Sequence, residues 1–438
     1  MSTIIKAQIS KKVNYLFKKY ESANVGTITK PEFKLFKDLI FGLMKSQSPI
    51  VNSINRKLEE PISLKHTEKR LRRHLGKRDL EQRFQEVFLK ANKNTLKTSQ
   101  FIIVDDSDIV KEYSNIMENL ANVRDGDKHI IKKGYHILNG FAVSSDGENC
   151  SPVYSELYST LEKDFKSGNE KILKMHRLIS KYKSLNPLIS VHDRGFDRGK
   201  LFIPAIENDD YFICRLNEKR YLRKNDKTFK PQDWKNIELT NSCIANHITK
   251  SGKIKKTKYL VGIISVELPN KKVIGKKLWL LVSKKTGTRI KDDQGFSYYL
   301  AYLPEKITGA EALETIFRGY GYRWKIEEYH RFLKSELHYE KMCLQRYSAL
   351  KIMNVLMMIF SSFIFKGLKR ILFKFISLDL SKKEFKRLFS EKPLFIYYKL
   401  AKALKKLTTS MKLYELKTEA LKENIPTLFD YMESGGVV

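Results

Sequence analysis

The chain has 438 residues, of which 42% are hydrophobic, so it can form roughly two or three domains with a substantial core. It carries 83 Lys and Arg against 49 Asp and Glu, giving a formal net charge of +34 and a pI near 9.7. This composition excludes a disordered charged tail and predicts a polyanionic partner. Nucleic acid is favoured over an anionic membrane surface because the basic residues are spread along the whole chain.

The cysteine pattern and the apolar segments narrow the class of protein further. No CxxC or Cys/His pairing occurs, so neither a zinc site nor a disulfide framework is expected, and a reducing cytoplasm is the simplest location. The N-terminus mixes charges into its apolar residues, unlike a secretory signal. The most apolar stretch, residues 352–365, is about 14 residues long, which is too short to span a bilayer, so we expect a buried core helix.

Residues 1–97 show helical periodicity and contain no good strand pattern. Thr67 followed by Glu68 is typical of a helix start, and basic residues surround Leu71 and Leu75 at helical spacing. We expect a small helical domain whose basic helix binds DNA. A solvated basic face without a specific partner remains the alternative, because phosphate contacts require only such a face.

From residue 99 the apolar period changes from helical to extended. FIIVDDSDI at 101–109 predicts a buried strand that ends in acids, and residues 132–159 predict two strands joined at an Asp-Gly turn. Residues 157–184 are charged and helical, and PLISVHDRGFD at 187–197 is a second apolar strand that ends in an acid. This order predicts an α/β fold, in which active groups gather at the carboxyl ends of strands.

Residues 205–304 interrupt this alternation with short strand-like runs and turns rich in Lys, Asn and Gly. No helical stretch separates these runs, so we expect an all-β insertion. After Pro304 helices resume through residues 318–341 and the apolar stretch. The tail from residue 366 to 432 is predicted to be helical and strongly basic.

Residues 318–341 predict one continuous helix with an unusual polar stripe. Its four recurring side chains are separated by two, three and six residues: Tyr320, Arg323, Glu327 and Lys334. At about 100° per residue all four fall within about 60° of one another, and Arg331 joins them. One carboxylate among a phenol and several cations is unusual for a solvated surface. It suits a carboxylate that holds a metal ion beside phosphates, although a basic amphipathic helix with a Glu327–Arg331 pair remains open.

Two strand-end acids can act together with this glutamate. Asp105, Asp193 and Glu327 come from distant segments, which is the usual way to hold Mg²⁺ through oxygen ligands, with Mn²⁺ as a possible substitute. A site with two such ions can activate a water or a 3′-hydroxyl for in-line phosphoryl displacement. Arg323 and Lys334 would position the DNA phosphates. Taken alone, each aspartate could instead be a turn former or a helix cap.

The motif helix YGYRWKIEEYHRFLK resembles the signature of bacterial cut-and-paste insertion-sequence transposases of the DDE type. VDDSDI at 104–109 is similar to their first-aspartate strand, and HDRGFD at 192–197 is similar to their second. The resemblance covers roughly residues 98–345 and implies an RNase H-like catalytic core. The organisation that follows is a helical DNA-binding domain at 1–97, the core at 98–204 and 305–370, the β insertion at 205–304, and a basic helical region at 371–438 for possible dimerisation.

The resemblance also assigns roles to individual residues. Asp105, Asp193 and Glu327 would be the catalytic, metal-binding triad. Asp106 is the rival for the first position, and the Asp-x-Ser spacing to Ser107 favours Asp105. Trp279 matches a tryptophan that stacks on a flipped base in relatives with a hairpin intermediate, unless it is a core residue of its strand. Four residues would bind transposon-end phosphates: Tyr320, Arg323, Arg331 and Lys334.

The implied function is a Mg²⁺-dependent DNA transposase with two ions in each active site. It would bind the terminal inverted repeats of its element, cut them, use a hairpin on the element end, and join 3′-hydroxyls to target DNA. It would act on double-stranded DNA as a homodimer in the bacterial cytoplasm, associated with the nucleoid. The alternatives are a catalytically inactive DNA-binding regulator or decayed copy, and a structure-specific nuclease with the same core.

Overall fold

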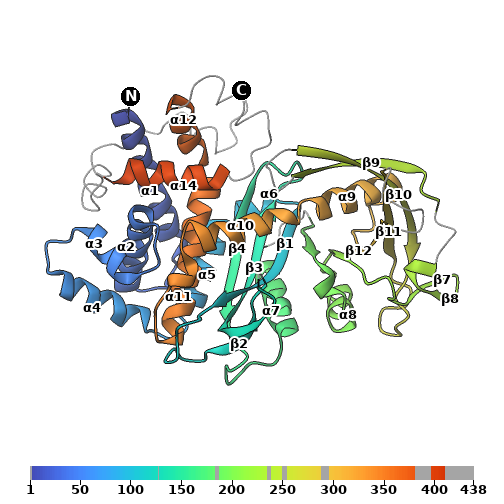
Figure 1. Ribbon diagram of the computed structural model, residues 1–438, viewed down its shortest axis with the longest axis horizontal. Helices are drawn as coiled ribbons and strands as arrows, with labels where there is room; N and C mark the ends of the chain where they lie inside the picture. Colours follow the sequence, from blue (N-terminus) through green and yellow to red (C-terminus); the bar gives the residue numbers. More distant parts are fainter. Residues whose placement is uncertain are drawn as a thin grey trace.

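The computed structural model describes residues 2–126, 128–182, 187–233, 238–248, 254–287, 295–379 and 396–409. In this part of the chain a ten-stranded mixed sheet adjoins a group of helices, so the fold is mixed α/β (Figure 1). The helices that begin and end the described chain lie together on the left of Figure 1, and the strands continue to the right.

The first part of the chain is helical, as the apolar periodicity predicts. Its helices are α1 (Ser2–Ala23), α2 (Lys30–Ser46), α3 (Val51–Leu58), α4 (Leu64–Leu75), α5 (Leu80–Ala91) and α6 (Lys93–Thr98). Helix α2 begins with Pro31 in its first turn, and Glu32 Oε2 accepts a 2.8 Å hydrogen bond from Thr29 N. In α4 the predicted apolar positions Leu71 and Leu75 are fully buried, and Lys69, Arg72 and Arg73 are exposed.

The sheet combines antiparallel and parallel neighbours. Its strands are β1 (Phe101–Val110), β2 (Ala121–Arg124), β3 (Ile131–Val143), β4 (Cys150–Tyr158), β5 (Ile189–His192), β6 (Phe212–Arg215), β9 (Asn241–Ile248), β10 (Ile254–Val266), β11 (Leu278–Lys285) and β12 (Phe296–Tyr302). The order is β2-β3-β1-β5-β6-β12-β11-β10-β9, with β4 also paired to β3. Strands β1, β5 and β6 are parallel, and the other neighbours are antiparallel.

The segment expected to be an all-β insertion does not form a separate sheet. Strand β12 pairs with β6, so this segment extends the central sheet, and a short hairpin of β7 (Leu222–Lys224) and β8 (Lys227–Phe229) lies beside it. Helix α8 (Gly199–Glu207) also reaches into the segment, where no helix was expected. Its Pro204 concealed the helical pattern, because proline usually marks a helix end.

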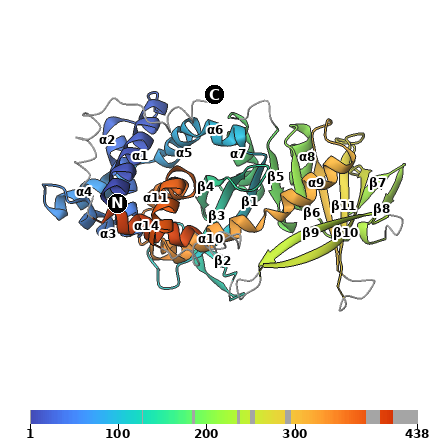
Figure 2. The same ribbon diagram turned by 90° about the horizontal axis from the view of Figure 1, so that it is seen from above.

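Helices cover both faces of the sheet. Helices α9 (Gly309–Gly321) and α10 (Trp324–Ser335) follow one another across one face (Figure 2), and α7 (Gly168–Ser180) and α8 pack on the other. Alternation along β6 separates two cores. Phe212 and Cys214 join a smaller core with Phe202 of α8, and Ile213 joins the larger core beneath α9.

The predicted continuous motif helix is interrupted, which corrects the sequence prediction. Helix α9 ends at Gly321 and α10 begins at Trp324, and Arg323 N bonds to Tyr320 O three residues back. Two glycines in the last turn of α9 weaken helical backbone there. Gly319 is needed for close packing, because a Cβ at this position would lie 2.6 Å from Phe101 Cε1.

The apolar stretch near the C-terminus is a core helix, as expected. Helix α11 (Tyr347–Ser362) continues into a π-helical turn, η4 (Phe363–Gly367), and packs against β4, α2 and α5. The span Tyr347–Gly367 is long and apolar enough to cross a membrane, yet 89% of its most apolar window is buried inside the protein. Helices α12 (Lys369–Asp379) and α14 (Ile396–Thr408) follow, and the rest of the predicted basic tail lies outside the described residues.

Candidate active site

A pocket of about 820 Å³ lies beside the second half of β1 and the end of β5, beneath α9 and α10. Distant segments of the chain contribute its walls. All but one of the site residues named from the sequence line it: Asp105, Asp193, Tyr320, Arg323, Glu327, Arg331 and Lys334. The interruption between α9 and α10 therefore leaves the polar stripe on one side, facing the strand ends.

The parallel pairing of β1 and β5 brings the two aspartates together. Ile103 pairs with Val191, so two residues further along each strand Asp105 and Asp193 come level. Neighbouring strands lie about 4.8 Å apart, and residues at the same level point to the same face. Two carboxylates thus stand side by side at the carboxyl edge of the sheet.

Adjacent Asp105 and Asp106 point to opposite faces of the sheet. Asp105 lines the pocket, whereas the carboxylate of Asp106 accepts a hydrogen bond from Tyr158 Oη of β4. Strand alternation explains this difference, because Phe101 approaches α9 and Ile102 approaches Met175 of α7. Asp105 therefore shares the pocket with Asp193 and Glu327, and Asp106 is not among the residues that line it.

Asp193 is both exposed to the pocket and fixed by a local hydrogen bond. Its Oδ1 accepts a 2.7 Å hydrogen bond from Gly195 N at the start of a short 3₁₀ turn. A Cβ at Gly195 would lie 2.9 Å from Asp193 Oδ1, so the glycine gives the carboxylate room. The capping role considered for Asp193 is therefore present, and its second oxygen does not take part in this hydrogen bond.

Glu327 pairs with Arg323 in place of Arg331. Arg323 donates a hydrogen bond from Nη2 to Glu327 Oε1, one turn back along the motif. The Glu327 side chain is 55% exposed, so it can rotate toward the aspartates without disrupting buried packing. The pair places one cation at the mouth of the acidic cluster.

The remaining motif residues surround the acids with cationic and aromatic groups. Lys334 Nζ lies 3.6 Å from Asp108 Oδ2 and 3.8 Å from Glu340 Oε1. Asp108 also lines the pocket, beside Lys334. The ring centroids of Tyr320 and of Tyr299 on β12 lie 4.6 Å apart. Tyr320 is held by this contact and lines the pocket.

His330 lies next to Asp105 in the lining of the pocket. Asn139 Nδ2 lies 3.0 Å from His330 Nε2, and because an amide nitrogen can only donate, Nε2 accepts this bond. The ring proton is then on Nδ1, which lies 3.7 Å from Asp105 Oδ2. Burial, with Lys334 and Arg323 nearby, lowers the pKa of His330 to about 3, so the ring is neutral at pH 7.

Two arginines in the pocket wall were missed by the sequence reasoning. Arg194 directly follows Asp193, and Arg215 is the last residue of β6. Arg194 could have been identified from its position in HDRGFD. Arg215 could not, because only the pairing of β6 with β5 brings this strand end to the site.

Trp279 is the predicted site residue that the structure does not bring to the pocket. It lies in β11 and packs against the larger core, with Lys277 Nζ 4.3 Å from the ring centroid. Strand β12 separates β11 from β6, whose Arg215 lines the pocket. Its placement agrees with the alternative of a strand core residue.

The acids are grouped so that they repel one another. The pKa of Asp105 is raised to about 7. The largest cause is burial, followed by the charge of Asp193, and Asp106 and Glu327 act in the same direction, whereas Arg323 opposes them. A cation among these carboxylates would relieve this repulsion. The donor set consists of carboxylate oxygens, the ligands that Mg²⁺ and Mn²⁺ prefer.

This donor chemistry fits a hard divalent cation, and the side chains need rearrangement to bind it. Across the described residues, no three Asp, Glu, His or Cys side chains stand at the spacing of a formed metal site. Glu327 would have to give up its hydrogen bond from Arg323 in order to bind the cation. Asp105 and Asp193 already lie level on adjacent strands.

The comparison with known proteins finds likeness at the level of solved structures. No family model matches the chain, and no curated protein matches it. The chain is similar to a piggyBac transposase, solved by cryo-EM as a synaptic complex with hairpin DNA, at 11% identity and a TM-score of 0.39. The likeness covers 96% of this chain and 84% of the other, and at these values it establishes neither the family nor the function of the chain.

Proposed function

We propose that the protein is a DNA transposase of the DDE type that cuts and joins DNA at the pocket beneath α9 and α10. The observation that carries the proposal is the convergence of Asp105, Asp193 and Glu327 from three distant segments into one pocket. The same pocket collects Arg323, Lys334 and further cations. Acids beside phosphate-binding cations are the combination that phosphoryl transfer on a polyanion requires.

The proposed chemistry has two steps, hydrolysis at the element end and joining to target DNA. In the first, water attacks the phosphorus at the element end, the P–O3′ bond breaks, and a 3′-hydroxyl and a 5′-phosphate result. In the second, this 3′-hydroxyl attacks a target phosphodiester, a new P–O3′ bond forms, and the target's own 3′-hydroxyl leaves. A hairpin between the two steps is part of the proposal on resemblance alone. The 3′-hydroxyl would attack the opposite strand, the 3′-hydroxyl of the flanking DNA would leave, and water would then reopen the hairpin and regenerate the 3′-hydroxyl for joining.

The residues around the acids would hold and orient the DNA. Arg323, Lys334, Arg194 and Arg215 are placed to bind the phosphates that flank the scissile bond. Mg²⁺ bound by the three acids would activate the attacking oxygen and stabilise the leaving one. The neutral His330 would hold the Asp105 carboxylate through its Nδ1 proton.

The topology supports an RNase H-like core as part of this proposal. Strands β4, β3 and β1 form an antiparallel set, and β5 and β6 follow in parallel beside β1. We assign this five-strand run to the core that the sequence resemblance implies. The strands from β9 to β12 would then be an extension of the core sheet on one side.

The test is cleavage of supercoiled plasmid that carries the DNA flanking the coding region, in Mg²⁺ or Mn²⁺. We expect the parent to nick the element end, and Asp193→Asn to reduce nicking by about 100-fold. Asp164→Asn is the matched control, because Asp164 is an exposed acid outside the pocket. Equal cleavage by Asp193→Asn and the parent would remove the catalytic assignment.

A nuclease with the same core would pass the first step and fail the second. Strand joining therefore separates the two functions. We expect a pre-cleaved, labelled end with a free 3′-hydroxyl to become attached to a target plasmid. Cleavage without any joined product would assign the protein to the nuclease class.

A further inference from the structure

Helix α14 is fixed on the protein by its apolar side. Leu400, Ala401, Leu404 and Leu407 are at most 1% exposed, and the helix packs against α2, α12 and η4. Gln47 donates a hydrogen bond to the carbonyl of Ala401, which joins α14 to the end of α2. The apolar side of this helix is therefore used within the chain, and its rotation about its own axis is set.

The opposite side of α14 carries only cations. Lys399, Lys402 and Lys405 are exposed, and within the described residues no carboxylate lies within ion-pair distance of any of them. Offsets of three residues place the three within about 120° of the helix circumference. We call these residues the α14 lysine face. The helix sequence IYYKLAKALKKLT has no Asp or Glu, so the i,i+4 pairs that usually balance a solvated helix are missing.

The α14 lysine face begins beside the pocket. The ring of Tyr398, in the first turn of α14, lies 6.3 Å from the ring of Phe332 on α10. Burial raises the pKa of Tyr398 to about 12, and the nearby Arg331 acts in the opposite direction. Arg331 also lines the pocket, so the first turn of α14 lies near one of the cations of the pocket.

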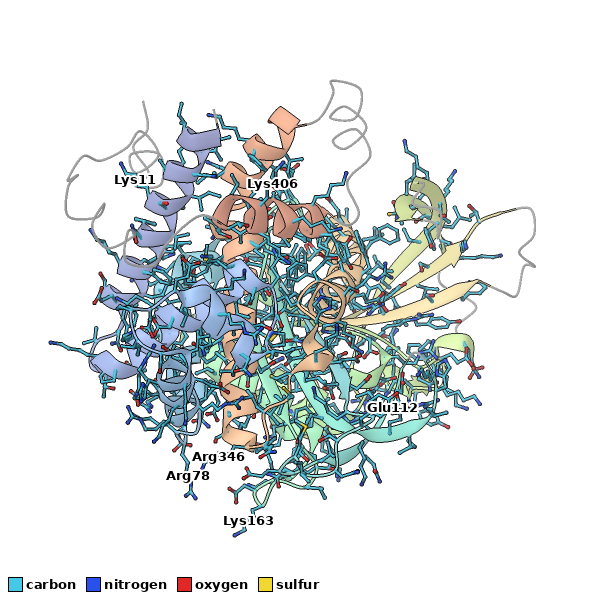
Figure 3. The ribbon with its side chains drawn as sticks, turned by 60° about the vertical axis from the view of Figure 1, so that its left-hand side comes forward. Lys11, Arg78, Glu112, Lys163, Arg346 and Lys406 are labelled. Atoms are coloured by element: carbon cyan, nitrogen blue, oxygen red, sulfur yellow. The ribbon has the colours of Figure 1, made fainter. Side chains whose placement is uncertain are left out.

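From this start the helix leads away from the pocket toward α1. Its 13 residues extend about 20 Å, which is the length of about six base-pair steps of duplex DNA. Figure 3 shows Lys406 of α14 and Lys11 of α1 in the upper part of the molecule, away from Lys163 and Arg78. Helix α14 thus leads from the neighbourhood of Arg331 to the part of the molecule that carries Lys11 of α1.

We propose that the α14 lysine face binds the phosphate backbone of the duplex whose scissile phosphate occupies the pocket. The inference rests on the proposed function and adds the path of the DNA outside the site. It assigns α14, one of the described helices of the C-terminal region, to DNA, whereas the sequence suggested this region for a dimer contact. The binding is to backbone phosphates, so it is independent of base sequence.

The experiment measures binding of a labelled 40-base-pair duplex, with and without the flanking element end, as a function of salt concentration. The variant replaces all three residues of the α14 lysine face by Gln. We expect its affinity at low salt to fall about 10- to 100-fold, and the slope of log K against log salt to fall by about 2 to 3. All three side chains are exposed, so the melting temperature should stay at the parent value.

The matched control removes the same charge at the far end of the sheet. Lys219, Lys271 and Lys272 are exposed residues in the segments that precede β7 and follow β10. Strands β7 and β10 lie on the other side of the molecule from α14 (Figure 1). We expect the control triple Gln variant to bind with nearly the parent slope. An equal loss in both variants would show an effect of net charge alone and would overturn the inference.

The outcomes separate this inference from the proposed function. If the parent binds no duplex at any salt concentration, the proposed function itself fails. If the parent binds and the α14 variant keeps its affinity and slope, only the inference fails. A variant that binds DNA like the parent but sediments as a smaller species would assign the face to a second copy of the chain, which also overturns the inference.

Discussion

Glu32 in the N-terminal helices and Asp105 in the pocket are both carboxylates with little exposure, and their surroundings act on them in opposite directions. Burial alone would raise the pKa of Glu32, but hydrogen bonds from Arg83, Thr29 and Lys77 lower it to about 2. Burial and repulsion from Asp193 raise the pKa of Asp105 to about 7. Acids of the first kind stabilise the fold, and acids of the second kind reduce stability and are available to a ligand.

This difference can be tested first at Glu32. Its side chain is 3% exposed and pairs with Lys77 and Arg83, so Glu32→Gln should lower the free energy of unfolding by about 3 kcal/mol. Urea denaturation measures the change. Glu68→Gln is the control, because its pair with Arg72 is a surface i,i+4 pair expected to contribute at most about 0.5 kcal/mol. Equal effects of both substitutions would contradict the structural role of Glu32.

Substitution of the pocket acid Asp105 should affect activity and not lower the free energy of unfolding. We expect Asp105→Asn to reduce DNA cleavage by about 100-fold, equivalent to about 2.7 kcal/mol of transition-state stabilisation. The free energy of unfolding should be unchanged or higher, because the substitution removes a repelled charge. Parallel cleavage and urea titrations measure the two quantities.

Asp106→Asn is the matched control for this substitution, since Asp106 lies on the other face of β1 and bonds to Tyr158. Its cleavage rate should stay near the parent value. The reverse pattern, with Asp106→Asn inactive and Asp105→Asn active, would make Asp106 the first catalytic acid.

Acid should weaken the fold through Glu32 in a defined range of pH. The folded pKa of about 2 lies below the ordinary glutamate pKa of 4.5, so the ion-pair contribution is complete above pH 4.5 and is lost as the pH falls toward 2. By pH 3 about 2 kcal/mol of it should be gone. The stability difference between the parent and Glu32→Gln should therefore shrink from pH 6 to pH 3, and a constant difference would rule out this origin.

The smallest expected effect on stability comes from the hydrogen bond between Tyr158 and Asp106, on the face of β1 opposite the pocket. Tyr158→Phe removes the hydroxyl that donates to Asp106 and should cost about 1 kcal/mol of stability. Cleavage by the folded protein should not change, because Tyr158 does not line the pocket. A large loss of cleavage without a loss of stability would connect this face to the reaction.

Local patterns predict much of the site. The strand that contains Asp105, the strand leading to Asp193, and the spacing of Tyr320, Arg323 and Glu327 all depend on neighbours within one or two turns. Strand β1 continues past the acids to Val110, whereas the sequence predicts that it ends in them. Each of these residues lines the pocket. The choice between Asp105 and Asp106 needed the strand pairing, because adjacent residues differ only in the face to which they point.

Long-range pairing accounts for what the sequence did not reveal. Strand β12 contains Phe296–Tyr302, yet only its partners β6 and β11 show that the segment extends the central sheet. Arg215 enters the site through that same arrangement. The break between α9 and α10 follows from two glycines whose local cost competes with a continuous apolar pattern, and close packing at Gly319 decides the outcome.

Metal-dependent rescue at Asp193 tests the central claim most directly. A thiolate binds Mg²⁺ poorly and accepts the softer Mn²⁺ more readily, so Asp193→Cys should be inactive in Mg²⁺ and should regain cleavage in Mn²⁺. The parent should cleave in both ions. Full cleavage by Asp193→Cys in Mg²⁺ would contradict the assignment of Asp193, and of the site built around it, to metal-dependent phosphoryl transfer.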